Sequence, residues 1–177
     1  MHLTQFSDYS LRLLLYLAAN GDRQVSVQEV SRAYGVSQHH LVKVVQVLVS
    51  EKLVASTRGR GGGLRLGQAP AAINVGAVVR LTEPHFHLVE CFDRATNRCP
   101  IDSACGLKGV LFQAQQAFLR ELDGHTLADF LPRAPALIRI WTQQLEPRAI
   151  TRAGRPLSAN AALRQRPPRS RSSAAAR

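Results

Sequence analysis

Apolar residues recur at helical spacing over residues 4–20, and they fall on more than one face of the predicted helix. A surface helix needs only one apolar stripe, so this helix is expected to pack against two neighbours. Gly21 supplies its end. The two stripes consist of Leu11, Leu14, Leu15 and Ala18, and of Leu13 and Leu17.

Two short helices are predicted next, joined by a tight turn. Ser26 and Glu29 stand at the spacing of a capping box, which predicts a helix over 27–34 that ends at Gly35. Ser37 is the expected N-cap of a second helix, which runs to about residue 51. Two short helices around a glycine-containing turn are typical of a helix-turn-helix.

Short apolar runs at 53–57 and 64–66 flank the glycine-rich segment 58–63, Arg-Gly-Arg-Gly-Gly-Gly. Glycines at this density supply the positive φ angles that a hairpin turn requires. The pattern therefore predicts a two-stranded wing. The segment lacks the Gly-Lys-Ser/Thr ending and the following helix of a phosphate-binding loop, so it does not indicate nucleotide binding.

The second half of the chain is expected to contain one long helix. A short helix is predicted over 73–81 and ends before Pro84. A polar loop that carries the three cysteines follows. A helix over 103–122 then carries one apolar stripe without an obvious partner, which suggests pairing with its copy in a homodimer. Shorter helices are expected at 126–131 and 136–145. The stripe consists of Leu107, Val110, Leu111, Ala114, Phe118 and Leu122.

The predicted fold class is mainly α, a winged helix-turn-helix with a two-stranded wing and a long C-terminal dimerisation helix. We expect a winged-helix DNA-binding domain over 1–82, a cysteine segment over 83–106, and the dimerisation helix with short C-terminal helices over 103–146. Residues 147–177 are rich in Arg, Ala, Pro and Ser and contain no acidic residue. This composition predicts a disordered basic tail.

The charge of the chain favours a polyanionic partner. The sequence has 23 Lys and Arg against 12 Asp and Glu, a formal net charge of +11, which suits nucleic acid or an anionic surface. Its longest apolar run is far shorter than the roughly 20 residues needed to cross a bilayer. No secretory signal is visible, so we expect a cytoplasmic protein. We expect its polyanionic partner to be DNA rather than a membrane.

The second helix of the helix-turn-helix carries an apolar inner stripe and a polar outer face. Glutamine side chains pair well with adenine edges, and lysine meets phosphate or guanine. Basic residues on the wing can follow phosphates or enter a narrow minor groove. The alternative is a solvated face on a winged helix that binds protein. The candidate DNA-binding residues are Ser37, Gln38, His39, Lys43, Arg58, Arg60 and Arg65.

Three cysteines follow the pattern Cys91-x7-Cys99-x5-Cys105. An odd number of thiols in a reducing compartment cannot form a closed set of disulfides, whereas thiolates suit zinc or iron-sulfur centres. Zinc sites usually contain a Cys-x2-Cys pair, which is absent here. A metal centre and three unrelated reduced thiols remain the alternatives. No histidine is accompanied by an interpretable nucleophile and carboxylate, so we do not expect an enzyme.

Taken together, residues 1–18, 34–45 and 58–66 and the three cysteines resemble the winged-helix iron-sulfur regulator family of NsrR and IscR. The resemblance covers about residues 1–131 and is nearest to the nitric-oxide-sensitive repressors of that family. It implies a homodimer on double-stranded operator DNA, with one 2Fe-2S or 4Fe-4S cluster per subunit. Nitric oxide would be the signal, and genes of nitric oxide detoxification would be the targets.

The resemblance also implies a ligand set. Regulators of iron-sulfur assembly in this family have a histidine three residues after the last cysteine, where this chain has Lys108. In the nitric oxide sensors an aspartate from the partner subunit completes the site, and Asp8 stands at the matching position. The implied ligands are therefore Cys91, Cys99, Cys105 and Asp8, with His85, His87 and Glu90 as the next candidates for the fourth. A family member that controls iron-sulfur or redox homeostasis, or an iron-sulfur or zinc protein whose winged helix binds protein, are the alternatives.

Overall fold

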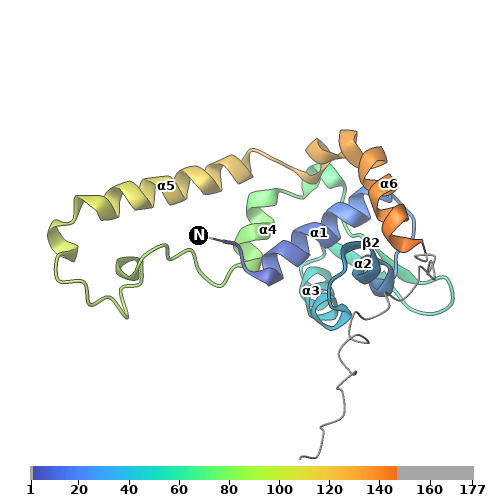
Figure 1. Cartoon of the computed structure of the whole chain (residues 1–177), viewed down its shortest axis with the longest axis horizontal. Helices are drawn as coiled ribbons and strands as arrows, with labels where there is room; N and C mark the ends of the chain where they lie inside the picture. The colour runs from blue at the N-terminus through green and yellow to red at the C-terminus, as the bar shows by residue number, and fades with distance from the viewer. Residues whose placement is uncertain (1, 147–177) are drawn as a thin grey trace, which may run out of the picture. The chain divides into compact units, whose positions relative to one another are not determined.

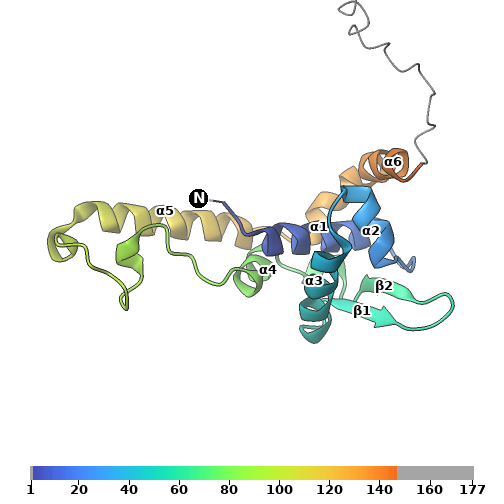
Figure 2. The same ribbon diagram turned by 60° about the horizontal axis from the view of Figure 1, so that its bottom comes forward.

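The computed structural model describes residues 2–146, so the predicted basic tail lies outside the described residues. Helices α1 (Gln5–Ala19), α2 (Val27–Tyr34) and α3 (Gln38–Ser50) are followed by strands β1 (Val54–Thr57) and β2 (Gly63–Leu66), as Figures 1 and 2 show. This arrangement confirms the predicted winged helix-turn-helix.

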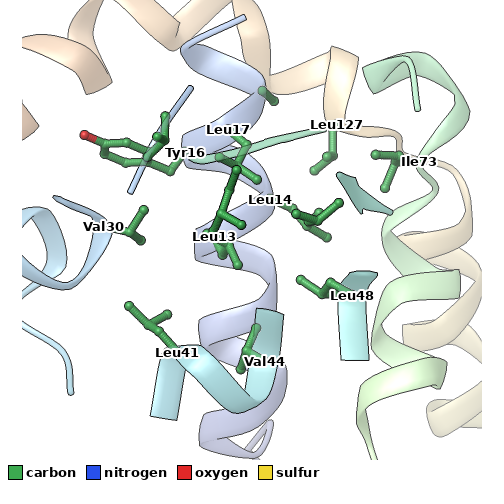
Figure 3. Close-up of a cluster of buried hydrophobic side chains, with 14 of the residues drawn as sticks. Leu13, Leu14, Tyr16, Leu17, Val30, Leu41, Val44, Leu48, Ile73 and Leu127 are labelled. Carbon is green, nitrogen blue, oxygen red and sulfur yellow. The ribbon is translucent and has the colours of Figure 1, made fainter. Parts of the chain in front are cut away.

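We call the winged helix-turn-helix part of the chain, residues 2–82, the head. Helix α1 lies in the centre of its core (Figure 3). Its Leu13, Leu14 and Leu17 are at most 1% exposed, and the helix packs against both α3 and α4 (Val75–Thr82). The prediction of a helix with two buried faces is confirmed. Full burial of a leucine side chain contributes about 1.5 to 3 kcal/mol, so these residues anchor the head.

The turn of the helix-turn-helix has the expected geometry. The Glu29 N–H donates to the Ser26 hydroxyl at 3.1 Å, and Gly35 adopts a left-handed φ of 65°. Ser37 occupies the N-cap position of α3, but its side chain makes no capping hydrogen bond. The predicted position of the N-cap is therefore confirmed, but the side-chain hydrogen bond that usually stabilises an N-cap is not formed.

The wing is an antiparallel pair in which Val54 lies opposite Leu66 and Thr57 opposite Gly63. Gly59 and Gly61 have positive φ angles of 97° and 78°, the conformation for which glycine was expected at the tip. The β2 strand also pairs with the segment before α2, because Val25 and Leu64 exchange both backbone hydrogen bonds at 3.0 and 2.8 Å. The base of the wing is thereby fixed to the head.

The connection from the wing to the long helix differs in detail from the prediction. Helix α4 begins at Val75, after a 3-10 turn η1 (Pro70–Ala72), because the Asn74 side chain caps it by accepting from the Ala77 N–H at 2.9 Å. The cysteine segment contains two further 3-10 turns, η2 (Glu90–Phe92) and η3 (Asp102–Ala104). Helix α5 (Gly106–Asp123) starts later than residue 103 because η3 occupies those positions.

The residues after α5 return to the head. The expected helix at 126–131 is a 3-10 helix, η4 (Leu127–Arg133). It contains Pro132, which lacks the backbone donor of a regular helix. Helix α6 (Ala134–Leu145) then packs against α2 and α1. Within residues 2–146, no helix combines the length and apolar character that crossing a bilayer requires.

Trp141 of α6 inserts into an aromatic cluster of the head. It is 5% exposed, and its ring lies 4.5 Å from that of Tyr16 and 5.6 Å from that of Tyr34, measured between centroids. The Tyr16 hydroxyl donates to Glu29 at 2.8 Å. Burial, together with this hydrogen bond, raises the pKa of Tyr16 to about 12, so the hydroxyl remains a donor at neutral pH.

Candidate functional site

Helix α3, the second helix of the helix-turn-helix, has one buried and one exposed face, as expected. Leu41, Val44 and Leu48 are at most 1% exposed, whereas Val45 of the expected inner stripe is only half-buried. The outer positions are exposed to solvent and lie near the N-terminal end of the helix. The exposed candidates are Ser37, Gln38, His39 and Lys43.

The two adjacent histidines at the start of α3 have different surroundings. The His40 ring stacks on Tyr9 of α1, with centroids 6.3 Å apart and an interplanar angle of 28°. It also lines a cavity of about 190 Å³ between α1 and α3, together with Phe6 and Lys43. Both histidines are exposed, but His40 also contacts Tyr9 of α1.

The arginines of the wing are available for an external anion. Arg58 and Arg60 are exposed at the tip, and Arg65 is exposed on β2 between the buried Leu64 and the half-buried Leu66. Within residues 2–146 none of the three arginines forms an ion pair with a carboxylate. Their charges remain uncompensated, as a contact with DNA phosphates requires.

The structure brings two of the three cysteines to one cavity. Cys91 in η2 and Cys105, the N-cap of α5, both line a space of about 520 Å³. Cys99 does not line it; its N–H donates to Asn97 at 3.0 Å, and its carbonyl accepts from the Asp102 N–H at 3.2 Å. In the part of the chain that the structure describes, no three His, Cys, Asp or Glu side chains are arranged as a metal site.

The chemistry of the cysteine segment nevertheless fits a thiolate-bound centre. All three cysteines are free and partly exposed. Lys108 lines the same cavity, and its Nζ lies 2.6 Å from the Asp102 carboxylate. The hydrogen bond with Asp102 raises the pKa of Lys108, so its ammonium group stays charged beside Cys91 and can compensate the negative charge of a centre bound by thiolates.

Asp8 has a partner within its own helix. Its carboxylate accepts from Nε and Nη2 of Arg12, each at 2.8 Å, and it does not line the cysteine cavity. The Arg12 guanidinium lies 5.7 Å from the centroid of the Tyr34 ring, and the Tyr34 hydroxyl donates to the Arg12 carbonyl at 3.1 Å. The first turn of α1 is thereby connected to the helix-turn-helix.

The alternative fourth ligands differ in their availability. His87 lines the cysteine cavity, and its ring stacks on His85 with centroids 4.8 Å apart. Glu90 is engaged inside the cysteine segment, where it accepts from the Arg98 N–H at 2.8 Å. Of these three residues, His87 is the one that shares a cavity with Cys91 and Cys105.

One residue beside the candidate site has no counterpart in the sequence analysis. Glu83, at the end of α4, accepts from the Thr4 N–H at 2.7 Å and from the Thr4 hydroxyl at 3.0 Å. Partial burial acts in the opposite direction, but hydrogen bonds from Ser7 and Thr4 lower the pKa of Glu83 and keep it ionised. The two ends of this contact are 79 positions apart, so no local pattern signals it.

Comparison with known proteins gives one consistent family. A family model described as Rrf2, iron-dependent transcriptional regulator, matches residues 3–133. The chain is 49% identical over 132 residues to the HTH-type transcriptional regulator NsrR of Halalkalibacterium halodurans, covering 74% of this chain and 90% of that protein. Both names denote transcription regulators rather than enzymes, as the sequence analysis expected.

Solved structures have the same fold. IscR of T. potens matches with a TM-score of 0.61 and 26% identity, covering 76% of this chain and 88% of that chain. CymR, the global cysteine regulator of B. subtilis, matches with a TM-score of 0.59 and 25% identity, covering 75% of this chain and 97% of that chain. These likenesses extend beyond the winged head to most of the described chain.

Proposed function

Because the chain belongs to the Rrf2 family of iron-dependent transcriptional regulators, we propose that it is a homodimeric repressor that senses nitric oxide through an iron-sulfur centre. Its proposed targets are genes of nitric oxide detoxification. The observation that carries the DNA-binding part is the exposed polar face of α3, flanked by wing arginines without carboxylate partners in the described structure.

We assign direct base readout to Gln38 and His39 at the start of α3, and contacts with the DNA phosphates to Ser37 and to the basic side chains of α3 and the wing. This follows the usual division in which amide side chains read base edges in the major groove. Charged side chains on exposed loops fix the register through phosphates. The proposed backbone contacts are Ser37, Lys43, Arg58, Arg60 and Arg65.

Gln38→Ala and Lys43→Ala are expected to differ in kind. The loss of a bidentate contact to adenine should cost about 1 to 3 kcal/mol on the operator and relax the preference at one base pair. Lys43→Ala should weaken operator and random DNA alike and reduce the salt slope by about 0.9. Binding-site selection and salt titration measure the two effects. An unchanged preferred site with Gln38→Ala would remove this residue from direct readout.

A second copy of the chain is the proposed partner of α5. Leu107 and Val110 of the predicted stripe are 62% and 61% exposed, and Ala114, one turn further along the same face, is also exposed. An apolar helix face this open is costly in water, and pairing with its own copy would bury it. The Cys-bearing start of α5 would then lie at an interface between subunits, where a residue of the other copy can complete the site.

Cys91, Cys99 and Cys105 would hold the iron-sulfur centre, with one centre per subunit. When bound, this group would supply an iron that nitric oxide can reach. Arg94 and Lys108 line the cavity and would compensate the negative charge of a thiolate-bound centre. Phe92 and Phe112, with ring centroids 6.2 Å apart, provide apolar walls that limit access of water.

Asp8 of the second copy is the proposed fourth ligand. A carboxylate is a weaker iron ligand than a thiolate, so it would be the ligand that a small molecule displaces most readily. In the structure the Asp8 carboxylate contacts Arg12, which in turn lies over Tyr34 of the helix-turn-helix. The ligand would therefore connect the cysteine segment of one subunit with the reading head of the other.

Asp8→Ala is expected to permit assembly by the three cysteines but to speed anaerobic loss of iron roughly tenfold. Arg12→Gln removes the same ion pair while keeping the carboxylate, and it should retain iron. The pair is an exposed contact at i,i+4, worth about 0.3 to 0.5 kcal/mol, so both variants should melt like the parent protein without metal. Equal iron retention in all three proteins would direct attention to His87.

The proposed function is tested with protein purified without oxygen. This protein should contain iron and acid-labile sulfide and should bind operator DNA, and nitric oxide should lower its affinity at least about tenfold, a coupling of typical allosteric size. Affinity that persists after treatment with nitric oxide would exclude this signal. A response to iron supply or thiol oxidation instead would favour a role in iron-sulfur or redox homeostasis.

A further inference from the structure

The beginning of the cysteine segment is held between two helices that are distant in sequence. On one side Glu83 accepts from the backbone and side chain of Thr4 at 2.7 and 3.0 Å. On the other side the side-chain amide of Gln115, a buried residue of α5, donates to the Phe86 carbonyl. All four residues line one cavity of about 600 Å³.

The Glu83 carboxylate occupies the place of a missing capping residue. Thr4 is the N-cap of α1, and its hydroxyl accepts from the Ser7 N–H at 3.2 Å. In a capping box, a Glu or Gln three residues after the N-cap returns the bond by accepting from the N-cap N–H. The residue at that position here is Ser7, and the carboxylate that accepts from the Thr4 N–H belongs to Glu83.

A helix capped in this way depends on a distant part of the chain. By contrast, the capping box of η4 is local, since the Asp129 carboxylate accepts from the N–H of its own N-cap, Thr126, at 2.7 Å. In α1 the acceptor is Glu83, the first residue of the cysteine segment. A displacement of that segment therefore withdraws a capping carboxylate from the helix that carries Asp8 and packs against α3.

We propose that Glu83 is a positioning residue that completes the capping box of α1 from outside the helix and so makes the cysteine segment and the first turn of α1 move together. We call the Glu83–Thr4 and Gln115–Phe86 contacts the clamp. Its regulatory use rests on the proposed function, but the clamp itself is a property of the protein without metal. The Gln115 side chain holds Phe86, in the same segment, from the side of α5. Residues 84–89 therefore cannot shift without breaking this hydrogen bond or moving α5 as well.

The clamp is tested by hydrogen exchange in the metal-free protein, with Glu83→Gln and the matched control Glu90→Gln. Glu90 also accepts a backbone hydrogen bond, but from Arg98 inside the cysteine segment. We expect Glu83→Gln to speed exchange in the first turn of α1 and in residues 84–89 roughly tenfold, as the loss of a charge-assisted bond implies. Glu90→Gln should leave α1 unchanged. Equal exchange in α1 for both variants would overturn the proposal.

A second variant separates positioning from simple stabilisation of the helix. Ser7→Glu combined with Glu83→Ala places the carboxylate at the local position of a capping box, next to the space that Glu83 leaves. Protection of α1 should return, while the faster exchange of residues 84–89 should remain. If both regions recovered together, Glu83 would be only a helix cap and the coupling would be refuted.

The regulatory use is measured as the ratio of operator affinities with and without the iron-sulfur centre. Glu83→Gln should reduce this ratio at least about threefold relative to the parent protein, and Glu146→Gln, at an exposed carboxylate after α6, should preserve it. An unreduced ratio in Glu83→Gln would show that the clamp carries no signal. If the parent protein itself showed equal affinities, the proposed function would fail, while the exchange experiments would still decide the clamp.

Discussion

Replacement of Trp141 by alanine is expected to lower the free energy of unfolding by about 3 to 5 kcal/mol. The side chain is 5% exposed and contacts two tyrosines of the head, at centroid distances of 4.5 and 5.6 Å. Its removal leaves a void between α6 and α2, which rigid aromatic neighbours cannot fill. For a domain of this size the loss is a large part of the total stability.

Chemical denaturation of the two proteins, followed by far-ultraviolet circular dichroism, measures this loss. Ile140→Ala is the matched control, because Ile140 is adjacent on α6 but 54% exposed. This control should shift stability by no more than about 0.5 kcal/mol, the usual range for surface substitutions. Equal effects of the two substitutions would mean that α6 does not hold the head through Trp141.

Cys99→Ala is expected to abolish retention of iron and sulfide while leaving the fold intact. Three thiolates are the smallest set that can hold a cluster with one exchangeable ligand, and the loss of one leaves too few donors. Cys99 is only half-buried and does not belong to the hydrophobic core. The metal-free variant should therefore unfold within about 0.5 kcal/mol of the parent protein.

The measurement is iron and sulfide per chain after anaerobic reconstitution, with Ser103→Ala as the control from the same segment. Ser103 is exposed and carries no thiol, so that variant should load fully. Full loading of Cys99→Ala would show that Cys91 and Cys105, which share a cavity, suffice with other ligands. His87 on the same cavity would then be the first candidate.

The sequence predicted the winged head because its signals are local. The spacing from Ser26 to Glu29, the glycine at residue 35 and the glycine-rich wing tip each specify a conformation within a few residues. The apolar stripes of α1 likewise indicated two packing partners, and α3 and α4 occupy them. The observed helix boundaries differ from the predicted ones where a side chain such as that of Asn74 caps a helix at a position that the pattern did not indicate.

The remaining features depend on contacts between distant positions. Periodicity indicated a helix over 136–145, but it gave no sign that Trp141 would pack on Tyr16 and Tyr34 of the head. The contact between Glu83 and Thr4 spans 79 positions and has no sequence signature. The spacing of the three cysteines indicated soft-metal chemistry, but it could not indicate that Cys91 and Cys105 line a cavity from which Cys99 is absent.

The pairing of Val25 with Leu64 has a consequence for how the wing can vary. Because β2 is bonded to β1 on one side and to the segment before α2 on the other, the strand cannot slide without breaking both sets of bonds. Insertions or deletions are therefore tolerable only at the tip, around Gly59 and Gly61, where the chain is exposed. A longer or shorter wing tip should thus leave the angle between the wing and α3 unchanged.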